Sequence, residues 1–164
     1  MRQFLRVAWI VMRKDLTVEV RSREILYTTV FFAASCVLVF AFALVREGRP
    51  MEDAAAGILW IAIAFAGTLA LGRSFERERQ TETLRALMLA PSDRPAIYVG
   101  KLLGILILLG VVEMVLVPMV GLLFNAPFGA SPLWLVVLLA AGTLGFASVG
   151  TLFAAMLVRA RSRD

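Results

Sequence analysis

Four long apolar stretches constrain the fold of this chain most strongly. They lie at 27–45, 54–71, 102–124 and 133–158, and Glu113 is the only charged residue within them. Each approaches or exceeds the length of about 20 residues that a helix needs to cross a bilayer. A soluble domain of this size would not gather its apolar residues into such uncharged blocks. The sequence therefore predicts an all-α integral membrane protein in which residues 1–164 form a single transmembrane domain.

Residues 1–25 show the periodicity of an amphipathic helix. Its apolar residues fall on one side of a helical wheel and its basic and polar residues on the other: Phe4, Val7, Ala8, Val11 and Val18 against Arg2, Arg6, Arg13 and Thr17. This pattern predicts an interfacial helix with its basic face toward lipid headgroups, although a basic flank that only fixes orientation would fit too. Asp15, Glu19 and Arg23 follow one another at a spacing of four, which predicts local ion pairs.

The segment 73–95 carries many charges between the second and third stretches. Its charged residues are Arg73, Glu76, Arg77, Glu78, Arg79, Glu82, Arg85, Asp93 and Arg94. It also holds an apolar strip at helical spacing, formed by Leu84, Leu87 and Met88 and followed by Leu89. In water such a strip requires a protein partner or the membrane surface. We predict a helix that another protein grips; the alternative is a solvated loop.

The distribution of basic residues predicts the orientation. Of the 17 Lys and Arg residues, only Arg46 and Arg49 fall on the side opposite the N-terminal arm, the segment 73–95 and the C-terminal end. Cytoplasmic loops carry the excess of basic residues in membrane proteins. We therefore expect both termini and the segment 73–95 in the cytoplasm.

Glu113 lies near the middle of the third stretch. A carboxylate at the centre of a spanning helix is unfavourable by a few kcal/mol, with Asp at about 3 kcal/mol. Glu113 should therefore face the bundle, be protonated or pair with a polar group. Two interpretations stay open: a residue on a substrate path or proton route, and a neutral side chain hydrogen-bonded across a helix interface.

The composition argues against several chemistries. The chain has no His and a single Cys, Cys36, so it offers neither an internal disulfide nor a Cys/His metal cluster. No Gly-rich phosphate loop followed by Lys is present, which excludes nucleotide hydrolysis of the P-loop type. Haem ligation would have to use Met, Tyr, Cys or another subunit. We expect a non-catalytic membrane subunit that binds no cofactor directly, with no nucleic-acid partner, and with ATP acting through a partner.

A series of short motifs resembles the CcmB family, the haem exporter protein B of cytochrome c maturation, a membrane subunit of ABC-2-type transporters. The motifs are Arg13-Lys-Asp-Leu16, Arg21-Ser-Arg-Glu24, Gly57-Ile-Leu-Trp60, Leu71-Gly-Arg-Ser-Phe-Glu76, Leu84-Arg-Ala-Leu-Met-Leu-Ala-Pro91, Tyr98-Val-Gly-Lys101 and Thr143-Leu-Gly-Phe146. Each motif alone has low specificity. Their order and spacing, which cover essentially the whole chain, are fairly specific.

The resemblance implies a bacterial inner-membrane complex. Its expected partners are a cytoplasmic ATPase subunit (CcmA), the membrane subunits CcmC and CcmD and, indirectly, the haem chaperone CcmE, which the complex releases with ATP hydrolysis. The segment 73–95 would be the coupling helix that docks on the ATPase. The residues expected at that contact are Phe75, Glu76, Glu78, Leu84, Leu87, Met88 and Leu89.

The resemblance also contains a departure. The family has six spans, whereas this chain ends after the fourth, so we expect an ABC-2-type half-transporter without the last two spans: a truncated gene model, a fragment or a split subunit. Two other functions are compatible with the pattern. One is an ABC-2 permease for a lipid or drug, and the other is a non-transporting scaffold that holds the haem-handling subunits.

Overall fold

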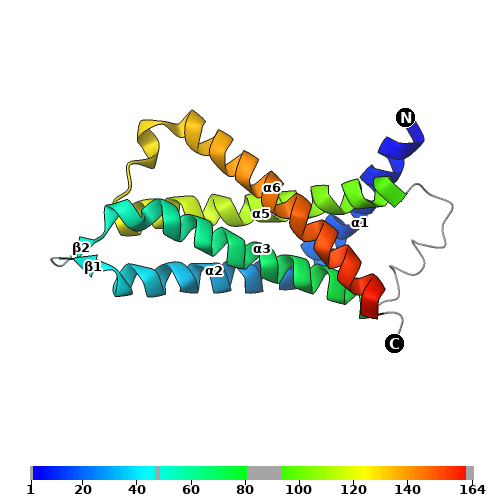
Figure 1. Ribbon diagram of the computed structural model, residues 1–164, viewed down its shortest axis with the longest axis horizontal. Coiled ribbons are helices and arrows are strands. Elements are labelled where there is room, and N and C mark those ends of the chain that lie inside the picture. Colours follow the sequence, from blue (N-terminus) through cyan, green and yellow to red (C-terminus); the bar gives the residue numbers. More distant parts are fainter. Residues whose placement is uncertain (1, 47–48, 81–93, 162–164) are drawn as a thin grey trace.

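A computed structural model describes residues 2–46, 49–80 and 94–161 (Figure 1). The long helices are α1 (Arg2–Ser22), α2 (Glu24–Ala43), α3 (Ala55–Gln80), α5 (Arg94–Phe124) and α6 (Pro132–Arg161). Short 3-10 helices precede α3 and α6, at η1 (Glu52–Ala54) and η2 (Phe128–Ala130). Two-residue strands, β1 (Val45–Arg46) and β2 (Arg49–Pro50), pair antiparallel between α2 and α3.

Four of these helices are long and apolar enough to cross a membrane. Their candidate spans are Glu24–Ala43, Glu52–Arg77, Pro95–Phe124 and Pro132–Ala154. The predicted all-α membrane class is therefore confirmed. The end of the second span differs from the expectation, because α3 continues through the charged residues to Gln80. Residues 73–80 extend the spanning helix, since Glu, Arg and Gln are good helix formers and no proline interrupts them.

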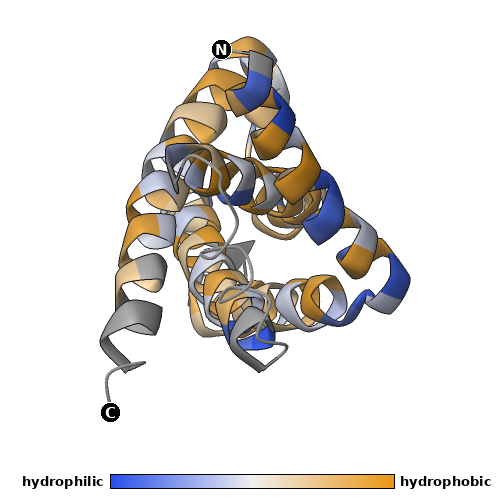
Figure 2. Cartoon of the chain, turned by 90° about the vertical axis from the view of Figure 1, so that its right-hand side faces the viewer, coloured by the Kyte–Doolittle hydropathy of each residue, from blue (hydrophilic) through white to orange (hydrophobic). Residues whose placement is uncertain are grey.

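The helices form a bundle with α1 packed across one end (Figure 1). Helices α2, α3 and α5 run along the molecule, and α6 crosses them obliquely. The end of α3 and the start of α5 lie at the same end as α1, which we call the α1 end; the paired strands and η2 lie at the other. Viewed from the α1 end, hydrophilic residues concentrate along the helix that begins at the N-terminus and at its corner with the next helix (Figure 2).

The core of the bundle is apolar and lies between α2, α3 and α5. Its most deeply buried side chains are Ala33, Val37, Ala62, Ile63, Ala66, Val112, Leu116, Val120 and Phe124. Large apolar side chains also cover the outside of the bundle, among them Phe31, Phe42, Met114, Leu122, Leu133 and Trp134. This distribution is expected for helices whose outer faces contact lipid or other membrane subunits.

Small residues bring α3 and α6 together. Trp60 of α3 packs on Gly142 of α6, where an added Cβ would collide with the indole ring. Two further contacts of a large side chain on a glycine join these helices: Phe146 packs on Gly67, and Leu71 packs on Gly150. Such close approach supplies the van der Waals contact that holds helices together in lipid.

We predict that Gly142→Val destabilises the protein by about 1–3 kcal/mol, the typical cost of overpacking a closed contact. The matched control is Gly145→Val on the same helix, because an added Cβ there meets nothing within 4 Å. The measurement is the free energy of unfolding in detergent micelles. Equal losses for the two variants would contradict the packing of α6 on α3.

Candidate functional site

Helix α1 lies directly against the first turns of α5. An added Cβ at Gly100 would lie 2.6 Å from the carbonyl oxygen of Ala8 and 2.8 Å from the Cβ of Val11. Ala8, Val11 and Met12 are buried by this contact, whereas Val18 of the same predicted apolar face is exposed. Part of the apolar face of α1 is therefore used for packing on the bundle. Glycine at position 100 is required by the close approach of the two backbones.

A buried ion pair joins α1 to α5. The ammonium Nζ of Lys101 lies 2.8 Å from Oδ2 of Asp15, and the Lys101 side chain is only 4% exposed. The same ammonium lies 5.6 Å from the centre of the Phe75 ring on α3. Lys14 also contacts Asp15, at 3.1 Å. Because a buried charge is tolerated only with a partner, Asp15 and the face of Phe75 allow Lys101 to sit in this packed position.

A second polar network joins α1, α2 and α3 through Glu19. One carboxylate oxygen of Glu19 accepts the backbone N–H of Leu26 at 2.7 Å, in the first turn of α2, where N–H groups have no partner within the helix. The other oxygen lies 3.3 Å from Nη1 of Arg77 on α3. Arg77 also donates to Ser22 at 2.9 Å and to Glu24 at 3.1 Å. Glu19 thus fixes the corner between α1 and α2 against the end of α3.

The predicted local ion pairs along α1 are wrong. Asp15 and Glu19 face the bundle and pair with residues far along the chain, on α5 and α3. Arg23 instead has φ 54° and ends α1 in the left-handed region, so it no longer lies on the helical surface. Its guanidinium donates to the hydroxyl of Tyr27 at 3.2 Å and to the carbonyl of Val20 at 3.4 Å.

The structure describes the side chains of only some of the docking residues expected from the sequence. Phe75 is buried at the α1 end, in a cluster with Leu71, Ile105, Leu109 and Ala147. Glu76 is exposed on the last turns of α3. Glu78 belongs to α3, but its side chain lies outside the described part. Leu84, Leu87, Met88 and Leu89 lie outside the described residues. Their docking role stays a prediction.

Glu113 is partly buried and has a polar partner on another helix. The hydroxyl of Thr143 on α6 donates a hydrogen bond to Oε1 of Glu113 on α5. Thr143 itself is buried. This geometry corresponds to the second interpretation of Glu113, a side chain hydrogen-bonded across a helix interface. Within the described ranges, no group of three or more His, Cys, Asp or Glu residues is arranged to hold a metal ion.

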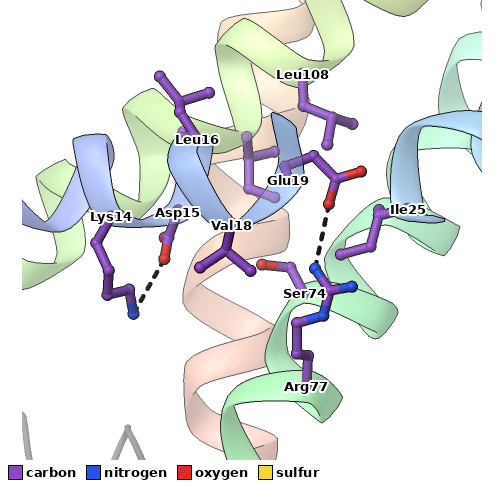
Figure 3. A pocket seen from close by; sticks show the side chains of 11 residues that line it. Lys14, Asp15, Leu16, Val18, Glu19, Ile25, Ser74, Arg77 and Leu108 are labelled. Atoms are coloured by element: carbon purple, nitrogen blue, oxygen red, sulfur yellow. Dashed lines mark hydrogen bonds and ion pairs between the residues drawn. The ribbon is translucent and has the colours of Figure 1, made fainter. Parts of the chain in front are cut away.

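A partly open cavity of about 170 Å³ lies between α1, the start of α2, the end of α3 and the first turns of α5 (Figure 3). Its charged lining consists of Lys14, Asp15, Glu19 and Arg77. Its other lining residues are Leu16, Val18, Ile25, Ser74, Gly104, Ile105 and Leu108. Sequence analysis did not identify this site. The available signal was that Lys101 and Arg77 lie near the ends of apolar stretches, where a charged side chain requires a carboxylate partner. That signal does not identify the carboxylates.

We predict that Asp15→Asn destabilises the protein by about 3–5 kcal/mol, because it removes the carboxylate beside a buried ammonium. Lys101→Met should destabilise the protein less, because Asp15 still pairs with Lys14 at 3.1 Å. The double variant should recover part of the loss, because the two positions are in contact. Unfolding in detergent measures the free energy for all three variants, with Asp53→Asn, at an exposed site in η1, as control. Additive losses at Asp15 and Lys101 would contradict the pairing.

Comparisons with known proteins point to one family. The family profile described as "CcmB protein" matches residues 6–164. Heme exporter protein B of Escherichia coli (strain K12) is 29% identical over 96 residues, which cover 58% of this chain and 44% of that protein. Heme exporter protein B of Rhodobacter capsulatus is 29% identical over 145 residues, covering 88% of this chain and 66% of the relative. No solved structure matches the chain significantly.

The chain thus spans between about two fifths and two thirds of the length of these relatives. The family match nevertheless extends from the first turns of α1 to the end of the sequence and includes all four candidate spans. The two networks that tie α1 to α3 and α5 also lie within it. On this match, the chain belongs to the CcmB family.

Proposed function

We propose that the chain is a membrane (permease) subunit of an ABC-type complex for cytochrome c maturation. In this proposal a separate ATPase subunit hydrolyses ATP, and the membrane subunit couples that hydrolysis to haem handling or to release of the haem chaperone. The observation that carries the proposal is the family match over residues 6–164. The names of the relatives, heme exporter protein B, agree with it.

The proposed orientation places the α1 end in the cytoplasm of a bacterial cell, with the spans in the inner membrane. The α1 end carries Lys14, Arg73, Arg77 and Lys101, in agreement with the excess of basic residues in cytoplasmic loops. A CcmA-like ATPase would then approach the segment between α3 and α5. CcmC- and CcmD-like subunits would pack on the apolar outer faces in the bilayer, and a CcmE-like chaperone would act indirectly.

The geometry of the α1 end suits the transmission of a displacement from the docking segment to the spanning helices. The proposed docking residues lie between the end of α3 and the start of α5, and α1 is tied to both helices through Arg77 and Lys101. A displacement of the docking segment would therefore move α3, α5 and α1 together. We propose that Glu76 and Glu78 contact the ATPase with the strip Leu84, Leu87, Met88 and Leu89. Phe75 would act from within, by supporting Lys101.

We predict that Leu84→Asp combined with Leu87→Asp abolishes co-purification with the proposed partner ATPase subunit. Two carboxylates would prevent an apolar strip from packing on a partner. The control is Asp53→Lys, an exposed site in η1 at the opposite end of the bundle. Undiminished binding of the double variant would argue against docking through this strip.

We predict that cells in which this chain is deleted lose their c-type cytochromes, measured by haem staining of membrane proteins, and that the intact gene restores them. Normal cytochrome levels after deletion would contradict the proposed function and favour a permease for another substrate. A scaffold differs from a coupled subunit in one respect. It would still support cytochrome assembly when the partner ATPase is inactivated by mutation.

A further inference from the structure

The cavity beside α1 lies at the level where the spans end. Ser74 and Arg77 line it from the last turns of the candidate span Glu52–Arg77, and Gly104 lines it from the early turns of Pro95–Phe124. From α1 it is lined by Lys14, Asp15, Leu16, Val18 and Glu19, and from the first turn of α2 by Ile25. In a membrane, such a position is the boundary between headgroups and acyl chains.

The lining of the cavity is amphipathic. Ile25, Ile105 and Leu108 provide an apolar wall, whereas two ion pairs border the cavity on either side of Val18 (Figure 3). One pair is Lys14 with Asp15, at 3.1 Å, and the other is Arg77 with Glu19, at 3.3 Å. A ligand that fits this lining must present charged and apolar groups together, as a membrane lipid does.

The charges of the lining are balanced. Lys14 and Arg77 each contribute a positive charge, and Asp15 and Glu19 each contribute a negative one. Lys101, which pairs with Asp15 at 2.8 Å, and Glu24, which pairs with Arg77 at 3.1 Å, add one charge of each sign beside the cavity. A purely anionic headgroup would meet two carboxylates, and a purely cationic group would meet two cations. A zwitterion with a phosphate and a primary ammonium matches both signs, because Lys and Arg donate to phosphate and carboxylates accept from ammonium.

The size of the cavity agrees with partial enclosure of a ligand. A volume of about 170 Å³ has room for several groups the size of water. It is smaller than the roughly 300–1,000 Å³ that encloses a whole drug-sized ligand. An occupant would therefore place its polar part and the start of its chains here and leave the remaining chains in the bilayer.

We propose that this cavity binds an aminophospholipid with a primary ammonium headgroup. Its phosphate lies toward Lys14 and Arg77, its ammonium toward Asp15 and Glu19, and its chains along Ile25, Ile105 and Leu108. Because the site is lined by four helices, a bound lipid holds α1 in place on the bundle. The proposal does not depend on the ATPase or on haem.

The test is native mass spectrometry of the delipidated protein in detergent with added phospholipid. Dioleoyl phosphatidylethanolamine should bind with an apparent Kd at least tenfold lower than phosphatidylcholine or phosphatidylglycerol with the same chains. Phosphatidylcholine lacks the ammonium N–H donors, and phosphatidylglycerol lacks the positive charge. Free phosphoethanolamine, without chains, should bind at least tenfold more weakly. Equal or tighter binding of either competing lipid, or of free phosphoethanolamine, would overturn the proposal.

Gly104→Leu tests the location of the site by filling the cavity. An added Cβ at Gly104 would lie 3.6 Å from the Cβ of Asp15, an ordinary contact, and the longer side chain would occupy lipid space. Phosphatidylethanolamine binding should fall at least tenfold. The matched control is Gly110→Leu on the same helix, because an added Cβ there meets nothing within 4 Å. Loss of binding in both variants, or in neither, would contradict the assignment.

A second, milder variant tests the site even if Gly104→Leu fails to fold. Lys14→Gln changes a side chain that is 33% exposed and removes a phosphate partner without filling the cavity. It should weaken phosphatidylethanolamine several-fold and leave the melting temperature of the lipid-free protein within a few degrees of the parent. Unchanged affinity for phosphatidylethanolamine in Lys14→Gln would contradict the proposed position of the phosphate.

Discussion

The ammonium of Lys101 needs a carboxylate, and this requirement places α1. Lys101 lies in the early turns of an otherwise apolar helix with its side chain almost entirely buried. Removing a charge from water costs several kcal/mol unless a partner compensates for it. Asp15 provides the partner at 2.8 Å, and the Phe75 ring lies on another side. Helix α1 therefore cannot leave α5 without exposing a buried ion pair and the close contact at Gly100.

Glu19 extends the same principle to the other helices. Its carboxylate accepts a hydrogen bond from the backbone N–H of Leu26 in the first turn of α2 and pairs with Arg77 of α3. Together with Asp15, it makes the amphipathic helix part of the bundle, in addition to any contact with lipid headgroups. The two ends of the chain segment that we propose to dock on an ATPase, at Gln80 and Arg94, consequently emerge from helices that α1 holds in place. A subunit that transmits a displacement requires this kind of support.

The apolar pattern was sufficient to predict the class of fold and part of the packing. The four spans follow from uncharged length, and Ala8 and Val11, which lie on the predicted apolar face of α1, are buried. The extent of α3 was missed because a change from apolar to charged residues was interpreted as a change of element. Helix propensity continues across that change, so Phe75 and Arg77 belong to the spanning helix.

The polar contacts could not be predicted in the same way. The spacing of Asp15, Glu19 and Arg23 is that of local ion pairs, yet their partners depend on which face of α1 meets the bundle. Glu113 was expected to face the bundle, be protonated or pair with a polar group, but its pairing with Thr143 depends on where α6 crosses α5. The positions of Trp60 on Gly142 and of Phe146 on Gly67 depend on the same crossing. Such contacts are properties of the packed helices and not of any single segment.

A disulfide between α1 and α5 tests the placement of α1 most directly. The Cβ of Asp15 and an added Cβ at Gly104 would lie 3.6 Å apart, within the range of about 3.5–4.5 Å found in disulfides. The background carries Cys36→Ser, to remove the native thiol, and Lys101→Met, to remove the ammonium that Asp15 neutralises. Oxidation of Asp15→Cys with Gly104→Cys in native membranes should give the intramolecular disulfide, seen as linked peptides by mass spectrometry. Two free thiols after oxidation, in protein that is inserted and folded, would contradict the account.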